Sequence, residues 1–228
     1  MGFQATESLA EQIARHLGQM IISGQLLPKA RIQEAKVASD LKVGRGSVRE
    51  ALLLLEKRQL IDIVPRKGAV VSELTTHRVE ALFDIYINLL VMLVSKLAVI
   101  WKDGDLEPML SQAQHVKTRT PDSQSAAENL IEAGFNIMSA GLAIVNNPYL
   151  EQVLNNFRPA ISRTYHLAIR CHRYEFTESM HFYSEVLQFV QKRDSASAKV
   201  VIEAFGEHQK VLLCRALNDL ENNEVQCA

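Results

Sequence analysis

The chain has 228 residues, of which 47% are hydrophobic and 22% charged, and its formal net charge is −1. This composition is typical of a globular protein of one or two domains and excludes a mainly disordered, collagen-like or low-complexity chain. The charge is uneven, because residues 1–75 carry 11 Lys and Arg against 8 Asp and Glu, whereas residues 76–228 carry 14 against 18. The asymmetry predicts that the N-terminal part binds an anionic partner.

Cysteine use and hydropathy predict a cytoplasmic protein with no membrane partner. The three cysteines are odd in number and widely spaced, which argues against a disulfide framework and against a cysteine zinc site. The N-terminus shows no signal-peptide pattern. The most apolar stretch, Ala81–Trp101, has only 11 successive uncharged residues, Ile85–Ser95, whereas a membrane span needs roughly 20. We expect this stretch to be a buried helix.

Residues 1–74 are predicted to form a winged helix-turn-helix with a small β-hairpin. Apolar periodicity and capping residues predict three helices, at residues 6–23, 33–41 and 45–58, the first capped by Thr6 or Ser8 and stopped by Gly24. Two short β-branched runs, residues 60–64 and 69–71, flank the turn sequence Pro-Arg-Lys-Gly at 65–68. Three helices followed by a hairpin are the outline of this DNA-binding domain.

Residues 75–228 are predicted to form an all-α bundle, so the fold class is mainly α. No strand signal follows Thr75, and long apolar-periodic segments alternate with short Gly, Pro, Asn and Asp breakers. The expected helices cover residues 77–102, 106–118, 124–145, 149–172, 178–192 and 195–220.

The start of the third helix has the chemistry of a recognition helix. Arg45 and Arg49 are four residues apart and therefore project from one face, opposite the apolar positions. An arginine can grip guanine O6 and N7 with two hydrogen bonds or hold a phosphate. Ser47 can donate to a phosphate, and Gly46 lets the backbone approach the duplex. These residues predict insertion of this helix into the major groove.

The hairpin supplies a second basic element. Arg66 and Lys67 lie at its tip, followed by Gly68, and suit a wing that lies against a groove or phosphates. Together with Ile22–Pro28 and Val43–Leu52, the segment Pro65–Val71 resembles the winged helix of the GntR family of bacterial transcription regulators. The resemblance implies DNA contacts from Arg45, Ser47 and Arg49 in the recognition helix and from Lys67 and Gly68 in the wing.

The C-terminal part resembles the all-helical effector domain of the FadR subgroup, which implies that residues 75–228 bind an effector and mediate dimerisation. The match is carried by Phe135–Met138, Leu142-Ala143, Asn147-Pro148 and Phe182-Tyr183. The resemblance implies a metal held by one Asp and three His, with an organic acid bound to the metal. This chain departs from that pattern, since the expected ligands fall on Glu132, on Asn136, on Tyr183 or Ser184, and on Glu207 or His208.

We therefore expect no cofactor and a metal-free effector pocket. The fatty-acid-responsive branch of the subgroup also lacks the metal ligands and binds an acyl-CoA thioester, which favours an acyl group or organic acid held directly by protein donors. The expected effector-binding residues are Tyr86, Glu132, Asn136, Arg163, Tyr183 and His208. If a metal were bound after all, its ligands would come from Glu132, His181 and His208.

The sequence predicts a homodimeric, ligand-responsive transcription repressor that binds a double-stranded DNA operator. One alternative is a helical interaction protein whose winged helix binds another protein. An enzyme is disfavoured because the chain has no Gly-rich phosphate loop, no G-x-S-x-G and no H-E-x-x-H. Steep salt dependence would separate DNA binding from an apolar protein interface.

Overall fold

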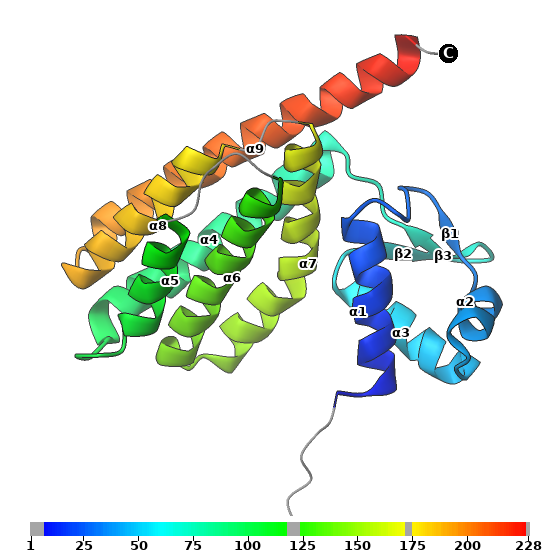
Figure 1. Ribbon diagram of the computed structural model, residues 1–228, viewed down its shortest axis with the longest axis horizontal. Helices are drawn as coiled ribbons and strands as arrows, with labels where there is room; N and C mark the ends of the chain where they lie inside the picture. The colour runs from blue at the N-terminus through cyan, green and yellow to red at the C-terminus, as the bar shows by residue number, and fades with distance from the viewer. Residues whose placement is uncertain (1–6, 118–123, 172–174, 227–228) are drawn as a thin grey trace, which may run out of the picture. The chain divides into compact units, whose positions relative to one another are not determined.

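The computed structural model describes residues 7–117, 124–171 and 175–226, and the chain divides into two compact units. The first unit contains the residues up to Leu74 together with Asn156–Arg163. The second contains Thr75–Asn155 and the residues from Thr164 onward. Figure 1 labels the helices and strands of both units. The described residues confirm the mainly α fold class, with a small antiparallel sheet confined to the N-terminal region.

The first unit combines three helices with a three-stranded sheet. The helices are α1 (Leu9–Ile22), α2 (Glu34–Leu41) and α3 (Arg45–Lys57), and the strands are β1 (Arg31–Ile32), β2 (Ile61–Val64) and β3 (Gly68–Val71). The strand order is β1-β3-β2, with Ile61 opposite Val71 and Arg31 opposite Val70. The sequence predicted the β2–β3 hairpin but not β1, because a two-residue strand is too short to show alternation.

Local sequence explains where α1 begins and ends. The Ser8 hydroxyl accepts a hydrogen bond from the Glu11 N–H at 3.2 Å, as an N-cap does, while the alternative cap, Thr6, lies outside the described residues. The helix ends before Gly24, whose φ of +81° is left-handed. The apolar stripe of α1 then packs against α3 and the sheet in a core that contains Ile13, Leu17, Ile21, Val48, Leu52, Leu55, Leu60 and Val71. This core holds α3 in place.

The second unit is built from helices alone. They are α4 (Thr76–Ile100), α5 (Glu107–Lys117), α6 (Gln124–Val145), α7 (Pro148–Arg170), α8 (Phe176–Gln191) and α9 (Ser195–Gln226). The segment Asn156–Arg163 of α7 groups with the first unit. The Thr75 hydroxyl caps α4 by accepting from the Arg78 N–H, and Asn147 caps α7 in the same way. Among the described elements, α4 and α9 pack against each other most extensively (Figure 1).

A single arginine closes the C-terminal end of α4. Nη1 of Arg193 donates to the carbonyl of Val99 at 2.7 Å, and Nη2 donates to the carbonyl of Trp101 at 2.8 Å. The guanidinium also lies 4.4 Å from the centre of the Trp101 ring, while the indole N–H donates to the carbonyl of Val190. The last carbonyls of a helix have no partner within it, so Arg193 supplies a donor to the Val99 carbonyl and ties the end of α4 to the turn after α8.

Among the described helices, α4 is long and apolar enough to cross a membrane by length and composition. Core helices of soluble proteins pass the same test, and α4 buries Phe83, Leu93 and Leu97 against neighbouring helices. Its opposite face is different, because Ile85, Met92 and Val99 are 53%, 45% and 67% exposed. The prediction of a buried helix therefore holds for one face of α4 only.

Candidate functional site

The first turn of α3 presents the predicted recognition residues to solvent. Arg45 and Gly46 are exposed and Ser47 is half-buried. The N-cap of α3 is Gly44, which has no side chain to accept from the first N–H groups. A Cβ placed on Gly46 would meet no atom within 4 Å, so the backbone itself is accessible there. The helix start therefore offers N–H groups, a hydroxyl and a guanidinium to an anion.

Arg49, one turn further along α3, is held by a carboxylate of α2. Its Nε donates to Oε1 of Glu34 at 3.4 Å and its Nη2 donates to Oε2 at 3.0 Å. This hydrogen bonding, together with the charge of Glu34, raises the pKa of Arg49, so the guanidinium stays charged at every relevant pH. Sequence reasoning did not single out Glu34, because no local pattern signals a pair 15 residues apart.

The hairpin between β2 and β3 forms a tight, basic tip. Arg66 and Lys67 are exposed, and the Lys67 N–H donates to the carbonyl of Val64 at 3.1 Å. Arg66 and Gly68 both have a left-handed φ, at +65° and +80°. Glycine adopts that conformation without steric cost, which explains Gly68 at the point where β3 begins. Both basic side chains thus stand on a constrained turn in the same unit as α3.

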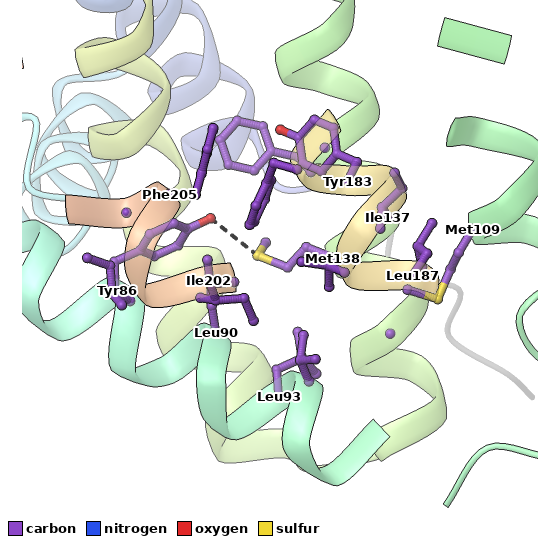
Figure 2. A pocket seen from close by; sticks show the side chains of 18 of the residues that line it. Tyr86, Leu90, Leu93, Met109, Ile137, Met138, Tyr183, Leu187, Ile202 and Phe205 are labelled. Carbon is purple, nitrogen blue, oxygen red and sulfur yellow. Dashed lines mark hydrogen bonds between the residues drawn. The ribbon is translucent and has the colours of Figure 1, made fainter. Parts of the chain in front are cut away.

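An apolar cavity of about 90 Å³ lies inside the helical unit, lined by residues of α4, α5, α6, α7, α8 and α9. This volume is several times the roughly 10–15 Å³ that one water molecule needs. Figure 2 shows Tyr86 and Leu90 of α4, Met138 of α6 and Tyr183 of α8 around it. The other walls come from side chains such as Phe83, Leu93, Met109, Ile131, Phe135, Val186, Leu187, Ile202 and Phe205.

Two glycines let aromatic and branched side chains pack into the cavity wall. A Cβ on Gly134 would lie 2.0 Å from the Tyr183 hydroxyl, and one on Gly206 would lie 2.4 Å from Cγ1 of Ile87. The Tyr183 ring therefore lies directly against the backbone of α6, and α9 approaches α4 closely. On the α8–α9 side the rings of Phe182 and Phe205 stack with centres 4.0 Å apart. This side of the wall is consequently aromatic.

Polar groups are few at this cavity. The Tyr86 hydroxyl donates to Sδ of Met138 at 3.6 Å (Figure 2), and a thioether is a weak acceptor that a better one would replace. Tyr86, Tyr165 and Tyr183 bring the only side-chain hydroxyls among the described residues that line it, and none of those residues carries a charge. The cavity can therefore bury an apolar group and orient it with one or two hydrogen bonds.

Of the six predicted effector-binding residues, the structure places only Tyr86 and Tyr183 at the cavity. Glu132 and Asn136 lie on α6 but are exposed, because Ile131, Phe135 and Met138 occupy the inward face of that helix. Arg163 is buried, and its Nη1 donates to the Ser72 hydroxyl at 3.0 Å within the first unit. Helical phase thus decides which side chains face the cavity.

His208 also lies away from the cavity, at the surface. Its Nε2 is 2.6 Å from Oε2 of Glu175, so it pairs with the N-cap residue of α8. His181 is exposed next to Ser184 and Glu185, in an open depression between α5 and α8. Within the described ranges, no group of three or more His, Cys, Asp or Glu side chains is close enough to hold a metal ion. The described His, Cys, Asp and Glu side chains therefore form no cluster that fits a transition-metal centre.

Comparison with known proteins gives a consistent result for both parts of the chain. Residues 9–71 match the family described as bacterial regulatory proteins, gntR family, and residues 81–208 match the FCD domain. The gluconate operon transcriptional repressor of Bacillus subtilis (strain 168) is 24% identical over 83% of this chain and 78% of its own length. Its namesake from Bacillus licheniformis is 25% identical over 72% of this chain and 66% of its own length.

Among solved structures, E. coli McbR/YncC is similar with a TM-score of 0.75 at 18% identity. The match covers 92% of this chain and 99% of that chain. At such low identity the likeness shows the fold alone. The residues matched by the two family models cover the winged helix and most of the helical unit, including every described residue that lines the cavity.

Proposed function

The chain belongs to the GntR family of bacterial regulatory proteins and is a transcriptional regulator with an FCD domain, and from this premise we propose that it is a homodimeric repressor whose operator binding is controlled by a metabolite in the apolar cavity. One observation carries the DNA-binding part. It is the solvent-exposed, uncapped start of α3, with Arg45 at its first position.

In this proposal α3 enters the major groove with its N-terminal turn toward the bases. Arg45 reads a base edge, and guanine is the best match for its two parallel donors. Ser47 and the first N–H groups of α3 hold a phosphate, which fixes the register without adding sequence information. Arg66 and Lys67 bring the wing against the neighbouring backbone or minor groove. A dimer then presents two such modules to a two-fold symmetric operator.

The test of DNA binding is its salt dependence on a selected operator. A duplex is first enriched from a random pool with the full-length chain, and its affinity is then measured by fluorescence anisotropy at salt concentrations from about 50 to about 200 mM. We expect the affinity to fall steeply with salt, because each phosphate contact releases a counterion. A selection that yields no preferred duplex, with salt-independent binding to another protein, would instead favour the helical interaction protein.

For the effector, we propose an acyl metabolite ahead of a small, highly polar organic acid. The relatives named for the gluconate operon suggest a sugar acid, but each hydroxyl group of a sugar acid needs a hydrogen-bond partner when it is buried. The described residues that line the cavity offer tyrosine hydroxyls within an otherwise apolar wall. Tyr86 and Tyr183 would orient the ligand directly, with no metal between ligand and protein.

This assignment predicts that one of two carboxylic acids stabilises the protein and that the other does not. Octanoate at about 100 times its dissociation constant should raise the melting temperature by about 5 °C or more, whereas gluconate should leave it unchanged. A Leu90→Trp variant, which fills the cavity, should lose the response to octanoate. Elemental analysis of the same preparation should find less than stoichiometric zinc, nickel or manganese. A response to gluconate alone, or near-stoichiometric metal lost on replacing His181 or His208, would contradict the metal-free acyl site.

A further inference from the structure

The ion pair between Glu34 and Arg49 connects the two helices of the helix-turn-helix by two parallel hydrogen bonds. The bonds run from Nε to Oε1 and from Nη2 to Oε2, which is the fork-on-fork geometry of an arginine with a carboxylate. Both side chains remain solvent-accessible, at 68% and 36% exposed. Ion pairs this exposed contribute little to folding stability. The main effect of the pair is therefore on the orientation of Arg49.

The pair fixes which edge of the guanidinium faces outward. A guanidinium has five N–H donors in one plane, and Glu34 engages the Nε hydrogen and one hydrogen of Nη2. The edge formed by Nη1 and the second hydrogen of Nη2 is left to donate to another group. That edge can give two parallel hydrogen bonds to a guanine or to a phosphate. Without Glu34 the long side chain of Arg49 would sample many rotamers.

We propose that Glu34 is a positioning residue that makes operator binding more selective, by orienting Arg49 for one arrangement of acceptors. The inference rests on the proposed DNA-binding function. The carboxylate has a second, opposite effect, because its negative charge repels the phosphates of any duplex. Orientation helps only where the DNA presents matching acceptors, whereas repulsion acts on every sequence. Together they lower non-specific affinity while preserving specific affinity.

The experiment compares Glu34→Gln with the unmutated full-length chain on the selected operator and on a scrambled duplex of equal length. We expect Glu34→Gln to bind the scrambled duplex more tightly and the operator no more tightly, so that the ratio of the two affinities falls by about five- to tenfold. Glu50→Gln is the matched control, since it removes the same charge from an exposed position of α3 next to Arg49. The control should raise both affinities in proportion and keep their ratio.

A double-mutant cycle separates orientation from charge. In an Arg49→Ala background, Glu34→Gln should leave the affinity ratio unchanged, because there is no guanidinium left to orient. Circular dichroism and thermal melts check that each variant is folded. An equal gain on both duplexes, as in Glu50→Gln, would overturn the positioning role while leaving the proposed function intact. Failure of the unmutated chain to bind any selected duplex would overturn the proposed function and this inference with it.

Discussion

Arg45→Ala is expected to weaken binding to the selected operator by about 1–3 kcal/mol, because the variant loses a bidentate contact to a base edge. This loss corresponds to about 5- to 150-fold in the dissociation constant. The fold should not change, since Arg45 is exposed at the first position of α3 and belongs to no core cluster. The measurement is anisotropy on the operator and on single-base variants of it.

The matched control for this prediction is Lys57→Ala. Lys57 is an exposed cation at the other end of the same helix, about 18 Å along its axis at 1.5 Å per residue. It should lower affinity little and leave the base preference intact. If Arg45→Ala instead weakens all duplexes equally and reduces the salt slope by about one, Arg45 contacts a phosphate rather than a base. Unchanged affinity for every duplex would contradict the placement of α3 in the groove.

The second large effect is expected when substitutions in α4 break the proposed dimer. Ile85, Met92 and Val99 are exposed, apolar and spaced by seven residues, so they form one stripe along this helix. Several exposed apolar side chains on one face of a helix can mark an interaction site. We expect two copies of the stripe to meet across a two-fold axis, in line with the dimer proposed above. An Ile85→Asp/Met92→Asp variant places charges in that contact, where they cannot be solvated.

This variant should be monomeric by light scattering at micromolar concentration and should lose at least about 100-fold in operator affinity. The loss follows because a monomer holds one half-site and forgoes the avidity of the second. Tyr149→Asp is the control, since Tyr149 is an 80% exposed apolar side chain on a different helix of the same unit. A dimer that persists in the α4 variant would show that another surface makes the contact. A monomer that binds the operator at full strength would contradict the need for a dimer.

Much of the architecture was predictable from local sequence because local physics determines it. The Ser8 and Thr75 caps, the glycine stop at Gly24 and the Pro-Arg-Lys-Gly turn each act within a few residues of chain. Apolar periodicity located the helices, although α9 extends to Gln226, beyond the predicted residue 220. Exposure of Arg45 followed from the opposite, apolar face of α3. These features depend on which residues are neighbours in sequence.

The sequence by itself thus determined the mainly α fold, the basic recognition turn and the family resemblance, whereas the tertiary structure alone decided what each side chain contacts. Resemblance placed effector residues at Glu132 and Asn136, yet the phase of α6 directs Phe135 and Met138 into the cavity instead. Pairing of Glu34 with Arg49 and the close approach of α9 at Gly206 likewise join residues distant along the chain. A periodic pattern specifies which face of a helix is apolar, but packing of whole elements selects the neighbour that covers it.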